Sequence, residues 1–285
     1  MWLSLALFSA LLFGVRRIYE KELTAVFGNF SLGFLLQVFS LVPMLALFLF
    51  FPLPENIFAL SWQFWWPLLI IWFVLYPVQT YFMYRSLREG ELSRVAPINA
   101  LLPVFNILTS YLLIGEEPTA LGSVGIIAIV VATFLLLVEP RAGESFTLNK
   151  PVLFMIIGTA LPALGSTFDK ISLQAATPVF YSFMNSLGAT VVLLILTFVF
   201  KQQGELARAK DSFWTLCVLG LVLAAAFVAA MVSFSLENTS YVLAVRCAGF
   251  LLPVVWGIFF LREQLSARKM LAVGLFSFGI LFLAL

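Results

Sequence analysis

The chain has 285 residues, of which 62% are hydrophobic and 11% are charged, and its mean hydropathy is +1.08. Ordinary water-soluble globular proteins are about 45–50% apolar and about 25% charged, so this composition excludes that class and predicts an integral membrane protein. The formal net charge is only +2, which gives no electrostatic reason to expect a nucleic acid or an acidic soluble partner.

Apolar runs long enough to cross a bilayer follow one another along the chain. A transmembrane helix needs about 20 apolar residues, and the charged, Pro-rich and Gly-rich breaks divide the sequence into about ten such runs. The first run has no basic residue before it and no small-residue cleavage site after it, so we interpret it as a span and not as a removable signal peptide. The predicted spans are 2–20, 31–51, 64–84, 93–114, 120–138, 151–170, 179–200, 213–235, 241–261 and 269–285.

The connections between the predicted spans are short, and the longest are 139–150 and 201–212. They leave no room for an extramembrane catalytic module, so we expect the helices themselves to carry the function. Cys217 and Cys247 both lie inside apolar runs, and no residues have the spacing of metal ligands. We therefore expect neither a disulfide nor a metal, and no cofactor.

The basic residues are unevenly distributed between the two sides of the predicted membrane. Only Lys170 and Arg246 lie at the side of the termini. Because positively charged connections are retained in the cytoplasm, we predict that both termini face outward and that the connections after spans 1, 3, 5, 7 and 9 are cytoplasmic. The residues expected at the cytoplasmic side are Arg16, Arg17, Lys21, Arg85, Arg88, Arg94, Arg141, Lys150, Lys201, Arg208, Lys210, Arg262, Arg268 and Lys269.

An internal repeat relates the two halves of the chain. The triplet Tyr19-Glu20-Lys21 returns as Phe168-Asp169-Lys170, 149 positions later, and Leu102-Pro103-Val104 returns as Leu252-Pro253-Val254. The halves are about 1–139 and 150–285, each with about five spans. An odd number of spans makes the second copy enter the membrane from the opposite face. Inverted repeats of this kind are typical of alternating-access transporters.

The order of these motifs resembles a known family over essentially the whole chain. In each half an LLP motif is followed by an acidic helix end, GEE or REQ, and then by a small-residue span, GSVGIIAIVVA or AVGLFSFG. This pattern resembles the EamA type of the drug/metabolite transporter superfamily. The resemblance implies ten transmembrane helices, arranged as two inverted five-helix repeats around a central cavity lined mainly by spans 1, 3, 4, 6, 8 and 9. It also implies export of amino acids, drugs or related amphiphilic metabolites across the cell (inner) membrane of a bacterium or archaeon.

Neutral polar residues recur at helical spacing inside two of the spans, 3 and 4. Stripes of this kind predict either the lining of a substrate cavity or hydrogen bonds between packed helices. Span 9 adds an aromatic residue and a proline in the same arrangement. The predicted cavity residues are Trp72, Tyr76, Gln79, Asn99, Pro103, Asn106, Phe250 and Pro253.

Charged residues near the span ends are candidates for gating or coupling, because ionisable groups in membranes are costly to place. Asp169 and Lys170 point about 100° apart on a helix and cannot neutralise each other, whereas Arg16 can pair with Glu20 at i, i+4. We predict a cluster of Asp169, Lys170, Glu237 and Arg246 at the face of the termini. A second cluster, of Arg16, Glu20, Lys21, Arg85 and Arg88, is predicted at the opposite face.

The sequence favours a secondary transporter and leaves its coupling open. The chain has no His, so coupling to protons would need a carboxylate, for which Glu20, Asp169 and Glu237 are the candidates. An uncoupled facilitator or exchanger, or a membrane protein that handles lipid, are the alternatives. The absence of a nucleophile–base pair argues against an enzyme. Small residues in spans 5 and 10 allow close helix packing, with a homodimer face as one use.

Overall fold

The computed structural model describes the chain except for residues 52–53, 55–56, 58–59, 91–94, 138–148 and 251–266. The described residues form helices and no strand. The helices of the first half are α1 (Trp2–Leu23), α2 (Asn29–Leu47), α3 (Trp62–Ile70), η2 (Ile71–Leu75), α4 (Tyr76–Glu89), η3 (Ala96–Leu101), α6 (Leu102–Ile114) and α7 (Ala120–Leu137). Those of the second half are α8 (Lys150–Leu173), α9 (Pro178–Val199), η4 (Gln203–Lys210), α10 (Phe213–Leu236), α11 (Thr239–Arg246), η5 (Cys247–Phe250) and α13 (Ala267–Ala284).

Five of the described helical segments are long and apolar enough to cross a membrane, and further apolar helices are shorter. The five are Asn29–Leu47, Trp62–Glu89, Lys150–Leu173, Pro178–Val199 and Phe213–Leu236. The predicted third span is continuous but contains a π-helical turn, η2. Most of the predicted ninth span, 241–261, lies outside the described residues, so the number of ten spans stays a prediction.

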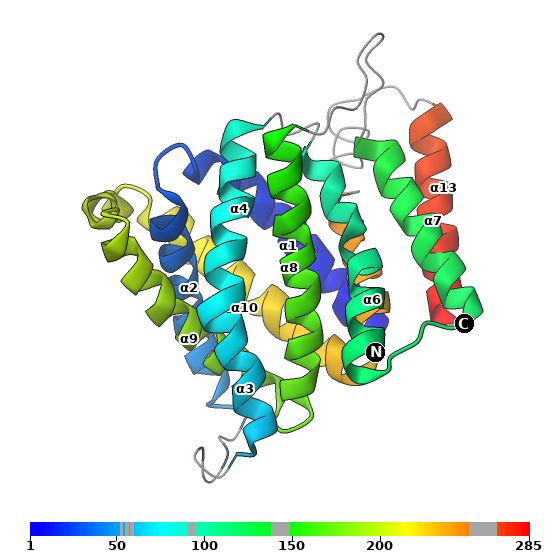
Figure 1. Cartoon of the computed structure of the whole chain (residues 1–285), viewed down its shortest axis with the longest axis horizontal. Helices are drawn as coiled ribbons and strands as arrows, with labels where there is room; N and C mark the ends of the chain where they lie inside the picture. The colour runs from blue at the N-terminus through cyan, green and yellow to red at the C-terminus, as the bar shows by residue number, and fades with distance from the viewer. Residues whose placement is uncertain (52–53, 55–56, 58–59, 91–94, 138–148, 251–266) are drawn as a thin grey trace.

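The helices run side by side between two faces, and both termini lie at the same face, which is the lower one in Figure 1. Helices of the two halves interleave: α1 packs on α10, α4 on α8, α2 on α9 and α7 on α13. The last pair approaches closely through glycine, because a Cβ atom on Gly125 would lie 2.8 Å from the carbonyl oxygen of Gly279. The small residues of predicted spans 5 and 10 thus pack against each other within one chain.

The connection between α9 and α10 caps the amino-terminal end of α2, about 170 residues away in sequence. Gln202 accepts hydrogen bonds from the backbone amides of Phe30 and Ser31, at 2.9 and 3.1 Å. Glu205 accepts from the Gly28 amide and the Ser31 hydroxyl, both at 2.5 Å. Gly28 leaves room for this contact, because a Cβ atom there would lie 2.5 Å from the Gln202 side chain. The second half therefore supplies the cap that α2 lacks from its own residues.

The cap predicts a difference between two neighbouring glutamines. We expect Gln202→Ala to destabilise the protein by about 1 kcal/mol, the usual cost of a lost helix cap, and to lower the melting temperature in detergent. Gln203→Ala removes a neighbouring exposed side chain and should leave the melting temperature unchanged. Equal melting temperatures for the two variants would show that the cap contributes nothing to stability.

Candidate functional site

A cavity of about 190 Å³ lies between helices of both halves. Residues of α1, α2, η2, α4, α6, α8, α9, α10 and α11 line it. Two smaller recesses, of about 60 and 30 Å³, share part of its wall. The three spaces therefore adjoin one another in the interior of the helix assembly. The residues shared with the 60 Å³ recess are Arg16, Gln37, Tyr76, Gln79 and Leu223, and those shared with the 30 Å³ recess are Phe13, Leu102, Leu243 and Arg246.

The π-helical turn η2 directs part of span 3 towards the cavity. Pro77 follows this turn and has no N–H group for the usual helical hydrogen bond, which favours a local change in helix winding. Tyr76 and Gln79 follow at i, i+3 and both line the cavity. The side chain of Tyr76 also interacts with those of Gln37 and Asn185. Tyr76 and Gln79, two of the residues predicted for the cavity, thus lie on its wall.

Asp169 lies on α8 at the wall of the cavity. Its side chain is buried, and it accepts a hydrogen bond from the hydroxyl of Tyr181 on α9. Among the described residues Asp169 has no ion pair within 4 Å. Arg246 of α11 lines the same cavity and interacts with Asp169 electrostatically across it. The buried carboxylate is therefore balanced by a cation at longer range.

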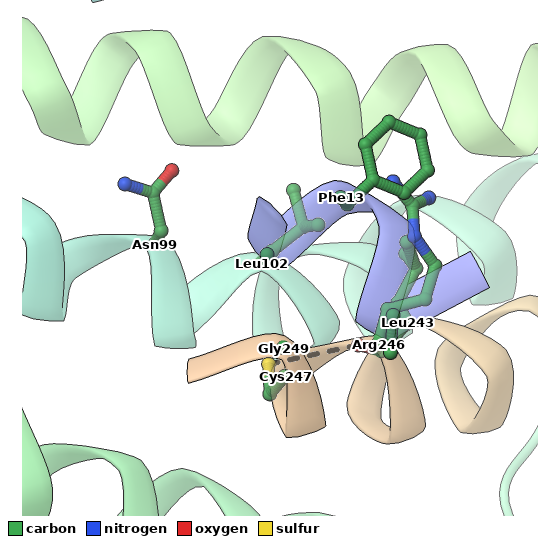
Figure 2. A pocket seen from close by; sticks show the side chains of 9 residues that line it. Phe13, Asn99, Leu102, Leu243, Arg246, Cys247 and Gly249 are labelled. Carbon is green, nitrogen blue, oxygen red and sulfur yellow. Dashed lines mark hydrogen bonds between the residues drawn. The ribbon is translucent and has the colours of Figure 1, made fainter. Parts of the chain in front are cut away.

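The Phe13 ring holds the guanidinium of Arg246. The guanidinium carbon lies 4.2 Å from the ring centroid, in a cation–π contact that Figure 2 shows beside the 30 Å³ recess. Asn99, Cys247 and Gly249 border this recess, so the 3-10 segments η3 and η5 of the two halves both contribute to it. Asn99 thus lies at the recess and not at the main cavity.

Glu20 has its own local partners, as the sequence predicts. Arg16 forms an ion pair with it at 2.7 Å, and the hydroxyl of Tyr84 on α4 donates to it at 2.7 Å. Glu20 is 3% exposed, and Arg16 extends to the cavity wall. Arg85 and Arg88 do not join this group, contrary to the predicted cluster. Arg85 pairs with Glu89 at 2.6 Å, and Arg88 donates to the backbone of the α1–α2 connection.

A second polar cluster lies at the face of the termini, and Glu116 forms its ion pair. Lys170 forms an ion pair with Glu116 at 2.5 Å and donates to the Glu237 carbonyl at 2.6 Å. Glu116 also accepts from the amide and the hydroxyl of Thr239, at 3.1 and 2.8 Å. We call Glu116, Lys170, Glu237 and Thr239 the outer cluster; it joins the end of α8 to the α6–α7 and α10–α11 connections.

The predicted cluster of Asp169, Lys170, Glu237 and Arg246 therefore does not form as one group. Lys170 and Glu237 meet in the outer cluster, whereas Asp169 and Arg246 face the cavity. The physical reason is the angle of about 100° between neighbouring side chains on a helix, which sends Asp169 and Lys170 to different surroundings. The side chain of Lys21, predicted for the opposite mouth, lies outside those that the structure describes.

Two other predicted cavity residues connect helices. Asn106 is fully buried; its amide nitrogen donates to the Ala163 carbonyl at 3.0 Å and to Ser166 at 2.9 Å, and its oxygen accepts from Ser240 at 3.0 Å. Trp72 donates from its indole nitrogen to Asn185 at 3.2 Å. These contacts match the alternative interpretation of the polar stripes, as hydrogen bonds between packed helices.

The remaining predicted cavity residues do not add to the described wall. Pro103 is buried in α6 and borders none of the three spaces. The side chain of Phe250 and the whole of Pro253 lie outside the described residues.

Gln37 of α2 and Ser186 of α9 line the cavity, and the sequence analysis did not select them. Each is a polar residue in an apolar run, LLQVFS and FMNSLG. Polar residues do lie at helical spacing from them: Ser40 is three residues after Gln37, and Ser182 and Thr190 are four residues before and after Ser186. Such small hydroxyl residues are also common where helices pack, so they did not mark a cavity face. Spans 2 and 7 thus contribute to the wall in addition to the spans that the family resemblance implied.

Within the described part of the chain, no group of three or more His, Cys, Asp or Glu residues could hold a metal ion. The polar groups around the cavity are amides, hydroxyls, two guanidinium groups and one carboxylate. Such a set can hydrogen-bond and orient a small polar molecule.

The comparisons with known proteins agree with this architecture. The family model described as "EamA-like transporter family" matches residues 1–138 and again 149–285. A solved structure with the printed title "Crystal structure of protein" superposes with a TM-score of 0.79 at 14% identity, covering 100% of this chain and 98% of that one, which shows a shared fold. The search of curated proteins found no match. The chain is therefore a multi-pass integral membrane protein of the EamA-like transporter family, within the drug/metabolite transporter superfamily.

Proposed function

We propose that the protein is a secondary transporter that exports a small metabolite, such as an amino acid, a drug or a related amphiphile, by alternating access. The observation that carries this proposal is the cavity of about 190 Å³, whose wall combines residues of both halves with buried polar groups. Polar groups inside a membrane protein are costly unless they serve a partner or a substrate pathway. A cavity built at the contact between two halves can change its access when the halves move against each other.

The two halves act as inverted repeats in this proposal, over residues 1–139 and 150–285. The helix packing supports this arrangement. If each helix is replaced by its counterpart in the other half, the contact of α1 with α10 becomes the contact of α8 with span 3. The repeat matches α1 with α8 and span 3 with α10, and the structure contains both α1 on α10 and α8 on α4. A rocking motion would then open one face while it closes the other, with the pseudo-twofold axis passing near the cavity.

The outer cluster acts as the gate at the face of the termini in this mechanism. Its ion pair and hydrogen bonds join three segments at this face: the end of α8 and two connections. Glu20 and Lys21, near the opposite end of α1, are the proposed gating residues at the other face. Opening the outer face would require the ion pair of Lys170 and Glu116 to separate. Water at this face can then solvate both side chains, so the separation costs little.

We further propose that the protein performs no covalent chemistry on its substrate, and that no cofactor takes part. The proposed location is the cell (inner) membrane of a bacterium or archaeon, with both termini outside. The bias of basic residues towards the other face supports this orientation. The small residues that suggested a homodimer face pack against each other within the chain. They therefore give the homodimer no support, and it stays a prediction.

Protons are the proposed coupling ion, with Asp169 as the group that carries them. A buried carboxylate without a close ion pair can bind a proton from one side and release it to the other. The groups that face Asp169 are Tyr181 on α9, Tyr76 at the start of α4, and Arg246 on α11, with Arg16 of α1 on the same cavity wall. In this mechanism a proton would move inward as the substrate moves outward.

Efflux from proteoliposomes tests the transport proposal. Vesicles containing the purified protein are loaded with radiolabelled amino acids, nucleosides and drugs, and release is measured against protein-free vesicles. We expect protein-dependent release of at least one solute. Absence of release for every solute, together with turnover of a bilayer lipid, would favour the lipid-handling alternative over a transporter.

Asp169→Asn tests the coupling proposal. With an acidic exterior, wild-type efflux should accelerate, because protons enter as the substrate leaves. The variant cannot change its charge, so its efflux should persist but lose its dependence on the pH gradient. Asp211→Asn, in the exposed η4–α10 connection, provides the matched control and should behave as wild type. An unchanged response to the gradient in Asp169→Asn would assign coupling elsewhere or point to an uncoupled facilitator.

The orientation is tested with a cysteine in a tag after Leu285, in a chain whose native cysteines are replaced. A membrane-impermeant maleimide should label this cysteine on intact cells, because the carboxyl terminus is proposed to lie outside. Labelling only after the membrane is permeabilised would reverse the orientation.

A further inference from the structure

Two polar side chains on the cavity wall have no hydrogen-bond partner among the described residues. They are Gln79 of α4 and Ser186 of α9, and both border the 190 Å³ cavity. A third wall residue, Gln37, interacts with Tyr76, but its buried Oε1 atom accepts no hydrogen bond from the described residues. Inside a membrane protein a primary amide or a hydroxyl normally finds a partner on a neighbouring helix, as Asn106 does through four side-chain and backbone contacts. Gln79 and Ser186 therefore have hydrogen-bonding capacity left for a molecule in the cavity.

The two groups come from elements that pack against each other. The helix α9 packs against η2 and α4, and Asn185, next to Ser186, interacts with Tyr76, one turn before Gln79. The charged residues Asp169 and Arg246 come from other elements, α8 and α11. The wall thus carries uncharged polar groups beside charged ones, with Arg16 bordering the same 60 Å³ recess as Gln79, and a bound molecule can present an uncharged polar end to Gln79 and Ser186.

The charges around the cavity cancel. Arg16 is paired with Glu20 at 2.7 Å, and Arg246 balances Asp169 electrostatically. The described groups leave no excess charge to compensate a ligand that enters with a net charge. Since an uncompensated charge in a low-dielectric interior is costly, the cavity favours a molecule that is neutral overall.

The volume limits the ligand further. Sites for drug-sized molecules usually measure about 300–1,000 Å³, whereas this cavity measures about 190 Å³. The space corresponds to a small metabolite and not to a large drug.

We propose that Gln79 and Ser186 form a neutral recognition subsite that hydrogen-bonds the uncharged polar end, a hydroxyl or carboxamide, of a small ligand with no net charge. This inference rests on the proposed transport function and specifies its substrate class. The amide of Gln79 can donate and accept, and so can the Ser186 hydroxyl. A ligand that presents a methyl group or a carboxylate at this end would leave both groups unsatisfied or would add an uncompensated charge.

The test uses two pairs of small probes that differ at one end. L-threonine and L-valine have the same net charge and similar shape, but a hydroxyl replaces a methyl group; L-glutamine and L-glutamate differ by a carboxamide against a carboxylate. Binding to the purified full chain in detergent is measured by competition against radiolabelled L-threonine and L-glutamine. We expect about tenfold preference for threonine over valine, the effect of one or two neutral hydrogen bonds, and at least that for glutamine over glutamate.

Substitutions assign the preference to the subsite. Gln79→Leu and Ser186→Ala should each reduce the threonine-to-valine ratio to about twofold or less, while valine binding stays near its wild-type value. Two matched controls remove the same groups elsewhere: Gln63→Leu, whose amide bonds Gln174 at an exposed position, and Ser182→Ala, one turn earlier on α9, whose hydroxyl donates to the Pro178 carbonyl. Both controls should keep the wild-type ratio.

The outcomes separate this inference from the transport proposal. If wild type binds none of the four probes up to about 10 mM, or binds valine as well as threonine and glutamate as well as glutamine, the subsite is wrong. This result needs no variant, so a variant that fails to fold does not block the test. If the expected preferences are found but loaded proteoliposomes release none of the probes, the subsite stands and the transport proposal fails.

Discussion

The absence of water inside a bilayer is the constraint on which this structure depends. Every polar group that the chain places among its helices must find a partner in the protein or face a cavity where a solute can serve as the partner. Asn106 takes the first solution, bonding α8 and α11 from α6. Gln79 takes the second, on the wall of a cavity at the contact between the halves. Side-chain amides in this protein thus differ in surroundings: that of Asn106 bonds neighbouring helices, whereas that of Gln79 borders a cavity.

The same constraint explains how the charged residues are arranged. Lys170 and Asp169 are neighbours in sequence, yet the first meets Glu116 at the face of the termini and the second faces the interior. The ion pairs of Lys170 with Glu116 and of Arg16 with Glu20 satisfy charges near the two ends of the helices. Asp169 and Arg246 both line the cavity and interact electrostatically, so the buried carboxylate is balanced by a cation within the protein.

Sequence patterns predicted the positions of most spans well, because apolar length and charged breaks are properties of the chain alone. They also predicted the local pair of Arg16 and Glu20, which depends only on helical spacing. The cluster at the face of the termini was predicted to contain Asp169 and Arg246 instead of Glu116. Which residues meet there depends on the rotation of each helix about its axis and on which connection lies nearby. Glu116 reaches Lys170 from the α6–α7 connection, a contact that no spacing rule contains. Gln37 and Ser186 were missed because the polar residues at helical spacing from them are small hydroxyls, Ser40, Ser182 and Thr190, which are equally typical of helix packing.

The central claim is that the outer cluster must open for a solute to cross, which reducible cross-linking tests most directly. Cysteines replace Lys170 and Glu116 in a chain whose native Cys217 and Cys247 are alanine, and a bifunctional methanethiosulfonate of matching length bridges them. We expect efflux from proteoliposomes to stop on cross-linking and to recover when the bridge is reduced, while the unbridged double variant stays active. Full efflux in the cross-linked protein would contradict the account.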